Sequence, residues 1–473
     1  MNTPGTPHTP RIEVPFDADH AQQAVEYGYA REWSDGLPLV PVTPALVDRF
    51  LATTPRDPAE VIGRMEHLGR SCTVELAAVN AAMAGCAPAH FPVVLAAWDA
   101  LMLERAARGG AWQSTSGPSP LIVVNGPIRK ELGFNSTGGA LGPGFRANAT
   151  VARALGLIVR NAFGLSPHGL EQSTQGVPGR WTLCIGENEE DSPWEPLAAS
   201  TGLGAPDAVT ATLLRTCAYV DNRHTADPEQ VLWDLADAMS ATGSIIFRHT
   251  ACALVLGPDH ARMLADAGYS RRDVQQWLYE HAGRTVADLR RAGKDGVGED
   301  NGVRYATGTA PDAPGGEEFV RFLSSPESIP VLVAGAHGAA MSMVGRIFGA
   351  WSGTAVPIVR SEPDPNPSRR PDVLDTDALA QVRRTLEADG FHLDAREDGD
   401  RLHITVTADP GTCGDCLVPK GVLRQILRRA LGIPAESIDV TYPNDSVGSY
   451  DPLGPSDALG PGATRATREE TAK

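Results

Sequence analysis

A glycine-rich run between a strand-like and a helix-like segment sets the strongest constraint on how this chain folds. The run covers residues 135–144 and reads Asn-Ser-Thr-Gly-Gly-Ala-Leu-Gly-Pro-Gly. Before it, the β-branched apolar residues in 120–127 are typical of a buried strand closed by turn residues. After it, apolar residues recur at helical spacing from Val151 to Phe163, and Asn148 is the expected N-cap. The unit is therefore strand, glycine-rich loop, helix.

A loop of this kind can bind a ligand through its backbone. Glycine lacks a Cβ, so backbone N–H groups can approach a ligand closely, and the following helix adds partial positive charge. The run matches neither the P-loop nor the dinucleotide fingerprint, and the alternative is an irregular surface loop. We expect a site for a small anionic substrate, with these candidate binding residues: Ser136, Thr137, Gly138, Gly139, Arg146 and Asn148.

Two further segments repeat the pattern of strand, glycine turn and helix. The apolar run 251–256 leads to Gly257 and two helix-like segments through His281, with the pair Asp259-His260 expected at a helix start. The run 329–334 leads to a glycine turn and a helix expected through Phe348. Two more helices are expected within residues 73–105. We predict a large mixed α/β domain over residues 16–360, with several loops converging on one edge.

Three side chains of this domain are the candidate catalytic groups. Cys184 lies in the strand-like run 180–186, and Glu187 opens an acidic segment directly after it. Strand ends carry the chemistry of open α/β sheets, and a carboxylate there suits a general base or a metal ligand. His337 lies between glycines at another strand end, a position that suits proton transfer or ligand binding. The alternatives are a solvated acidic loop and a merely exposed histidine.

Charge and composition exclude several partner classes. The formal net charge of −17 argues against an electrostatic nucleic-acid binder. No uninterrupted apolar stretch approaches the roughly 18 residues of a membrane span, and residues 1–15 lack the apolar core of a signal peptide. The seven cysteines, an odd number, do not indicate a disulfide framework. We expect a cytoplasmic protein with a small-molecule substrate and no nucleic-acid or membrane partner.

Segments rich in proline and charge divide the 473 residues. We expect disordered residues 1–15, the α/β domain 16–360, a linker 361–373, a small α+β domain 374–445 and a disordered tail 446–473. The small domain contains Cys413-Gly414-Asp415-Cys416. Two thiols at this spacing can share a metal or form a disulfide, but two ligands do not complete a tetrahedral site. Metal binding, dithiol redox or sulfur transfer, and a structural role therefore stay open.

The small domain resembles the NifU-like domain of iron–sulfur carrier proteins. The shared features are Asp389-Gly390 after the first helix, a strand pair, the Gly-x-Cys-x-x-Cys motif and Leu423-Arg424. The resemblance implies that Cys413 and Cys416 bind a [4Fe–4S] cluster that bridges the two subunits of a homodimer. The chain has Leu417-Val418-Pro419 where that family has Pro-Ser-Ser.

The large domain resembles a group of uncharacterised bacterial proteins. The likeness implies no chemistry and is carried by Asp35-Gly36-Leu37-Pro38, Met83-Ala84-Gly85-Cys86, Arg146-Ala147-Asn148-Ala149-Thr150 and Pro193-Trp194-Glu195-Pro196.

Together these features predict an enzyme, an oxidoreductase or sulfurtransferase, that acts on a small anionic substrate. The Cys-x-x-Cys domain would supply electrons or sulfur, with a redox or sulfur-donor protein as a further partner. Two alternatives stay open. One is an iron–sulfur carrier whose large domain only docks partners, and the other is a lyase or hydrolase that uses the acidic loop around Glu187.

Overall fold

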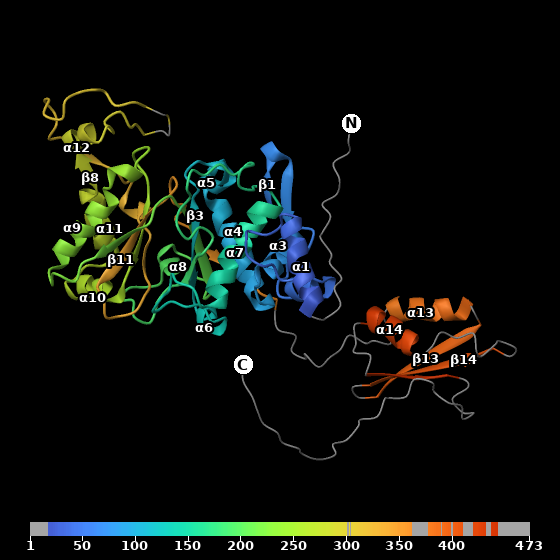
Figure 1. The fold of residues 1–473 in the computed structure, drawn as a ribbon. Coiled ribbons are helices and arrows are strands. Elements are labelled where there is room, and N and C mark those ends of the chain that lie inside the picture. Colours follow the sequence, from blue (N-terminus) through green and yellow to red (C-terminus); the bar gives the residue numbers. More distant parts are fainter. Residues whose placement is uncertain are drawn as a thin grey trace, which may run out of the picture. The chain divides into compact units, whose positions relative to one another are not determined.

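The computed structural model describes residues 18–299, 302, 304–361, 377–388, 390–398, 401–409, 420–431 and 437–442. The chain divides into two compact units, Met1–Ser361 and Glu362–Lys473 (Figure 1). Several predictions lie outside the described residues: the disordered ends 1–15 and 446–473, the linker 361–373 beyond Ser361, and the pair Cys413 and Cys416.

The first unit contains two four-stranded mixed sheets with the same strand arrangement. The first has the order β12 (Val356–Pro357), β5 (Ala208–Leu214), β3 (Ser119–Asn125), β4 (Leu183–Gly186). The second has the order β6 (Ala218–Asp221), β11 (Met341–Arg346), β7 (Cys252–Leu256), β10 (Val331–Val333). In each sheet one inner strand, β3 or β7, has a parallel neighbour on one side and an antiparallel neighbour on the other.

The two sheets pack face to face between two layers of helices. Alternate residues of a strand point to opposite faces, so Leu121 and Val123 of β3 contact the second sheet, whereas Ile122 and Val124 contact helices. Helices α3 (Val74–Ala84), α4 (Phe91–Leu103) and α7 (Arg146–Asn161) pack against the outer face of the first sheet and form a hydrophobic core with it. Helices α9 (Pro228–Met239), α10 (Pro258–Asp266) and α11 (Arg271–His281) cover the second sheet. The result is a helix, sheet, sheet, helix sandwich (Figure 1).

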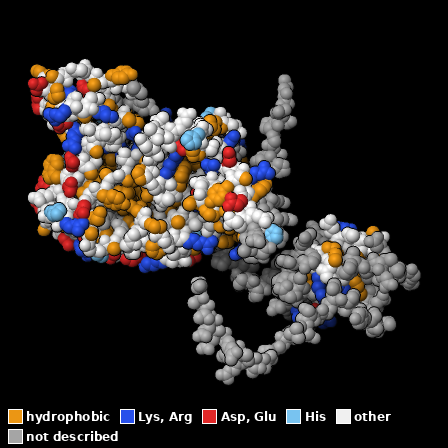
Figure 2. Space-filling view, viewed as in Figure 1, with side chains coloured by type: hydrophobic (Ala, Val, Ile, Leu, Met, Phe, Trp, Pro, Cys, Tyr) orange, Lys and Arg blue, Asp and Glu red, His pale blue; other side chains and the backbone are white. Residues whose placement is uncertain are grey.

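Shorter elements complete the first unit. They are α1 (Ala18–Ala30), α2 (Pro44–Leu51), the pair β1 (Val61–Met65) and β2 (Arg70–Thr73), α5 (Arg105–Arg108), α6 (Ile128–Glu131), α8 (Leu197–Ser200), the pair β8 (Gly283–Thr285) and β9 (Phe319–Arg321), and α12 (Val286–Arg291). Figure 2 shows hydrophobic side chains gathered on the visible face of this unit between β11 and α8.

Local sequence patterns correctly predict most of these helices and strands. The two helices expected within residues 73–105 are confirmed as α3 and α4. Thr73 caps α3 by accepting a hydrogen bond from the Leu76 N–H, and Gly85 ends it in the left-handed conformation at φ 93°. The strand and the two helices expected from residue 251 to His281 are β7, α10 and α11.

Two local predictions are wrong. The helix expected up to Phe348 is the strand β11, which is paired on both edges with β6 and β7. Pairing on both sides overrides the local pattern, because strand formation depends strongly on tertiary neighbours. Asn148 is not an N-cap: α7 begins at Arg146, and Asn148 lies within its first turn.

The second unit is a small α+β sandwich. Its described elements are α13 (Asp377–Ala388), β13 (Phe391–Asp398), β14 (Arg401–Ala408), α14 (Lys420–Leu431) and β15 (Ile438–Thr441). β13 and β14 form an antiparallel pair, and β15 joins β14 in parallel. The helix, strand pair and second helix expected here are present, whereas the NifU-like assignment stays a prediction. None of the described helices is long and apolar enough to cross a membrane.

Candidate functional site

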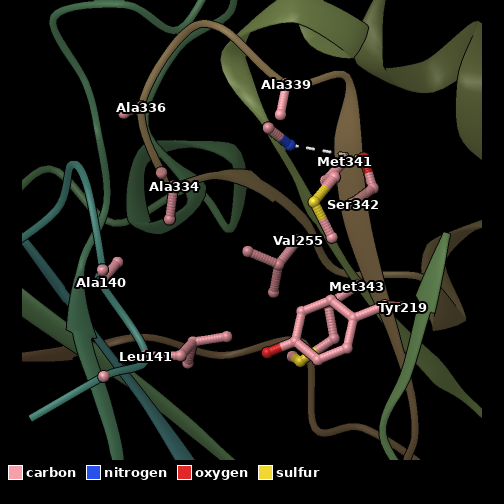
Figure 3. Close-up of a pocket in the computed structure, with 14 residues that line it drawn as sticks. Ala140, Leu141, Tyr219, Val255, Ala334, Ala336, Ala339, Met341, Ser342 and Met343 are labelled. Atoms are coloured by element: carbon pink, nitrogen blue, oxygen red, sulfur yellow. Dashed lines mark hydrogen bonds between the residues drawn. The ribbon is translucent and has the colours of Figure 1, made fainter. Parts of the chain in front are cut away.

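A cavity of about 380 Å³ lies in the first unit beside the glycine-rich loop. Residues 139–142 of that loop form one wall, and residues 334–336 with Ala339, from the loop after β10, form another (Figure 3). The remaining wall comes from the second sheet and includes Val255, Tyr219 and Met343. A cavity of this size is typical of small-molecule sites.

Hydrogen bonds between backbones hold the loops around the cavity together. The Gly335 N–H donates to the Ser136 carbonyl at 2.9 Å, and the Gly186 N–H donates to the Asn135 carbonyl at 3.1 Å. The Asn188 N–H donates to the Val333 carbonyl at 2.7 Å. The segments that follow β3, β4 and β10 are thus joined at one edge, where open α/β sheets place their ligands.

The cavity wall is mostly apolar but offers backbone donors. Its side chains include Ala140, Leu141 and Val255. Among the described residues, none accepts a hydrogen bond from the backbone N–H of Gly138, Gly139 or Leu141. Unpaired N–H groups beside an apolar wall suit a ligand with an apolar body and one acceptor group.

The comparisons found no matching family model, no matching curated protein and no matching solved structure. The site is therefore assigned from its geometry and from the residues that build it.

The structure separates the predicted substrate-binding residues into two groups. Gly139 lines the cavity, and a Cβ added at Gly138 would lie 3.6 Å from the Cβ of Ala336 across the loops. Ser136 and Thr137 lie at the start of the loop. The Thr137 N–H and hydroxyl both approach the Asn135 side-chain oxygen, at 3.1 and 3.3 Å, which shapes the turn.

Arg146 and Asn148 support the loop from outside the cavity wall. The Arg146 guanidinium donates to the carbonyls of Gly85 and Cys86 at 2.8 and 3.1 Å, joining the start of α7 to the end of α3. The buried Asn148 amide bonds to both backbone groups of Asn135. In this arrangement both side chains are engaged in positioning the backbone.

Cys184 lies in the core of the first unit. Its side chain is fully buried and belongs to the cluster between the first sheet and its helices. Burial raises the pKa of the Cys184 thiol well above its ordinary value, which disfavours the thiolate. The structure therefore does not bring Cys184 to the cavity.

Glu187 is also fully buried, at the end of β4. One of its carboxylate oxygens accepts hydrogen bonds from the Asn125 amide at 2.6 Å and the Leu197 N–H at 2.7 Å. The other oxygen has no hydrogen-bond partner among the described residues and lies 3.9 Å from Nη2 of Arg271. Burial raises the pKa of Glu187, while these two hydrogen bonds and Arg271 lower it in part.

His337 lies half-exposed on the loop that forms one cavity wall. Its Nδ1 is 2.8 Å from an oxygen of Asp259, and its Nε2 is 3.5 Å from an oxygen of Asp191. The Gly338 N–H donates to the other Asp259 oxygen at 3.0 Å. The hydrogen bond to Asp259, with support from Asp191, raises the pKa of His337.

Sequence reasoning also missed a buried histidine that contacts the strand β11 next to this site. His260 of α10 is fully buried, and its Nδ1 lies 2.8 Å from the hydroxyl of Ser342, a residue of the cavity wall. Its Nε2 lies 3.1 Å from the Asn222 carbonyl. The Asp259-His260 pair after a strand-ending glycine was a usable signal, but Ser342 had none, because β11 was expected to be a helix.

The described residues hold no group of three or more His, Cys, Asp or Glu side chains able to bind a metal ion. The candidate cluster ligands Cys413 and Cys416 belong to the second unit and lie outside the described segments.

Proposed function

We propose that this chain is an enzyme that binds a small anionic substrate in the cavity beside the glycine-rich loop. The observation that carries the proposal is the meeting of this loop with residues 334–339 around one apolar cavity. Unpaired backbone N–H groups at Gly139 and Leu141, which line the cavity, would donate to a carboxylate of the substrate. The α7 helix begins directly after the loop, so its N-terminal partial charge also favours an anion.

His337 is the proposed proton-transfer group. It is exposed to solvent on a cavity-forming loop and is held by the carboxylates of Asp191 and Asp259. A histidine in contact with carboxylates can take up and release a proton while its ring stays oriented. Cys184 and Glu187 are buried in the structure, so the support for a role in the chemistry is weaker for them than for His337.

We further propose that the chemistry is redox or sulfur transfer, supplied by the second unit. Support comes from the sequence: the Cys413-x-x-Cys416 spacing and the resemblance to NifU-like domains. A bound [4Fe–4S] cluster would provide electrons or sulfur, and Cys413 and Cys416 would hold it within a homodimer. Purification without oxygen, followed by iron and sulfide analysis, tests this part. Iron and sulfide that are lost in Cys413→Ser/Cys416→Ser support a cluster, and an iron-free wild-type protein overturns it.

Calorimetry with butyrate, a small carboxylate with an apolar tail, tests the cavity. We expect butyrate to bind more tightly than 1-butanol, which lacks the anionic group. Ala339→Phe fills the cavity and should weaken butyrate binding by about tenfold or more, which is about 1.4 kcal/mol. Ala340→Phe is the matched control, because Ala340 is the next residue and lies outside the cavity lining. Equal butyrate binding by wild type and Ala339→Phe would remove the cavity as the substrate site.

A further inference from the structure

We propose that the cavity selects monocarboxylates with an apolar tail, and that the Tyr219 hydroxyl donates a hydrogen bond to the bound carboxylate. The inference names a substrate class and a further binding residue for the proposed function. It rests on that function in one respect, namely that the cavity is the substrate site.

The strand register places Tyr219 on the cavity side of the second sheet. Tyr219 of β6 is paired with Met343 of β11, and Met343 is paired in turn with Val255 of β7. The side chains of directly paired residues point to the same face of a sheet. Met343 and Val255 belong to the core between the two sheets, so Tyr219 also faces that space. The three side chains form one row of the cavity wall.

The hydroxyl of Tyr219 is available to a ligand. The residue is 66% exposed, and none of the described residues forms a hydrogen bond with its hydroxyl. Figure 3 shows the ring beside Met343, with the hydroxyl directed towards Leu141 of the glycine-rich loop. A phenol hydroxyl can donate one hydrogen bond. The second sheet therefore supplies a donor that faces the loop across the cavity.

The donors of the two walls suit a carboxylate. Its two oxygen atoms together accept up to about four hydrogen bonds. The unpaired N–H groups of Gly139 and Leu141 are donors on one wall, and the Tyr219 hydroxyl is the donor on the other. Hydrogen bonds to an ionised acceptor are stronger than those between neutral groups. The site therefore favours a carboxylate over an alcohol of the same size.

The burial of the wall residues orients the ligand. Gly139 and Tyr219 are exposed, so the donors lie where the cavity meets solvent. Val255, Ala334 and Met343 are buried and form the inner end. The carboxylate stays near water in this orientation, and the tail of the ligand points towards the buried end, where apolar contact is favourable.

The inner wall offers no partner for a second charge. No lysine, arginine, histidine, aspartate or glutamate is among the described residues that line the cavity. The hydroxyl of Ser342 lies 2.8 Å from Nδ1 of the buried His260, on the side of the strand that faces the helices. Ser342 therefore meets the cavity through its backbone. A charge at the far end of the ligand would lose its hydration and gain no ion pair, which is costly.

Calorimetry with butyrate and succinate tests the substrate class on the full-length wild-type chain. Both have four carbon atoms, but succinate has a second carboxylate in place of the terminal methyl group. We expect succinate to bind roughly 100-fold more weakly than butyrate, because its second charge would face apolar side chains. The comparison needs no variant, so it does not depend on how a mutant folds. Equal affinity for the two would overturn the selection of monocarboxylates.

The variant Tyr219→Phe tests the tyrosine, because it removes the hydroxyl and keeps the ring. Butyrate binding should weaken roughly tenfold, the usual effect of losing one hydrogen bond to a charged group. Tyr305→Phe is the matched control, because Tyr305 is exposed and lies outside the cavity lining. Equal butyrate binding by wild type and Tyr219→Phe would remove Tyr219 from the site.

A spectroscopic measurement separates direct contact from an indirect effect on the loop. In protein with isotope-labelled tyrosine rings, butyrate should shift the nuclear magnetic resonance signal of the Tyr219 ring. The signal is assigned by its absence from Tyr219→Phe. An unshifted Tyr219 signal at saturating butyrate would overturn the contact.

The two proposals fail in different ways. A wild-type protein that does not bind butyrate overturns the cavity as a carboxylate site, and the proposed function with it. Butyrate binding that Ala339→Phe abolishes, with succinate bound equally well and no effect of Tyr219→Phe, supports the proposed function and overturns the selection of monocarboxylates by Tyr219 and the apolar wall.

Discussion

Asn148 holds Asn135 by both of its backbone groups. The Asn148 side-chain oxygen accepts a hydrogen bond from the Asn135 N–H at 2.9 Å, and its amide nitrogen donates to the Asn135 carbonyl at 3.0 Å. The two residues belong to the first turn of α7 and to the start of the glycine-rich loop. One buried side chain thus fixes where the loop begins relative to the helix that follows it.

Asn148→Ala should lower the free energy of unfolding of the first unit by about 2 kcal/mol, because the buried Asn135 N–H loses its acceptor and the Asn135 carbonyl keeps only the Gly186 N–H. It should also weaken butyrate binding, since the loop that forms a cavity wall loses its anchor. Denaturant unfolding and calorimetry measure the two effects. Thr137→Ala is the control, because it removes only an exposed hydroxyl contact at 3.3 Å. A variant as stable as wild type would contradict the anchoring role of Asn148.

Glu187→Ala should destabilise the first unit by about 3 to 5 kcal/mol. The substitution removes the acceptor of the Leu197 N–H and one acceptor of the Asn125 amide, and it leaves the buried Arg271 with the more exposed Glu195 as its nearby carboxylate. Glu190→Ala should cost no more than about 1 kcal/mol, because Glu190 is exposed and the buried Arg129 keeps its ion pair with Glu189 at 2.7 Å. Urea unfolding of both variants measures the difference. Similar midpoints for the two would show that Glu187 is not a structural carboxylate.

The Cys184 thiol should not react with iodoacetamide in the folded protein. It is fully buried, and burial raises its pKa, so neither access nor the thiolate is available. Modification should appear after unfolding in guanidinium chloride, as followed by peptide mass spectrometry. Cys217 is the internal comparison, because it is only partly buried and its pKa is raised to about 11. Rapid labelling of Cys184 in the native state would restore it as a candidate nucleophile.

The contacts of His337 should weaken as pH rises. Its pKa in the folded protein is raised by Asp259 and Asp191 above the unfolded value of about 6.5. The stabilisation is therefore fully present below about pH 6.5 and is lost as pH rises through the raised pKa. Nuclear magnetic resonance titration of the ring measures this pKa, and hydrogen exchange at the Gly338 N–H reports on the loop.

Asp259→Asn is the matching variant for this titration. It removes the charge of the nearest carboxylate but keeps a polar side chain of the same size. The pKa of His337 should then fall towards its ordinary value, with Asp191 as the remaining acidic neighbour. An unchanged titration in Asp259→Asn would show that the contact at 2.8 Å does not persist in solution.

Features that depend on residues close together in the sequence could be predicted from it. The apolar run of β3, the helices α3 and α4 and the glycine at position 85 follow from periodicity and turn chemistry, and the structure has them there. The glycine-rich loop was also a sound indication of a cavity wall, since residues 139–142 line the space. Glycine turns and local apolar patterns determine the backbone conformation of a few residues only, so they can be recognised in the sequence.

Features that depend on distant residues could not be predicted in the same way. Ser342 and His260 are 82 residues apart in the sequence. They meet only because β11 pairs with β7, the strand that precedes α10 in the chain. Arg146 was expected to bind a ligand, and the structure adds a contact that the sequence did not predict: Nε and Nη2 of its guanidinium donate to carbonyls 61 and 60 residues away.

The sequence by itself determined many of the helices and strands, the glycine-rich loop and the place of the Cys-x-x-Cys motif, because these are properties of short segments. Only the tertiary structure decided which side chains reach the cavity. Helices packed against the first sheet buried Cys184, and contacts with Asn125 and Leu197 buried Glu187. The pairing of β11 with β7 turned the Ser342 hydroxyl towards His260. Burial and pairing of this kind result from contacts between remote strands, which no local pattern encodes.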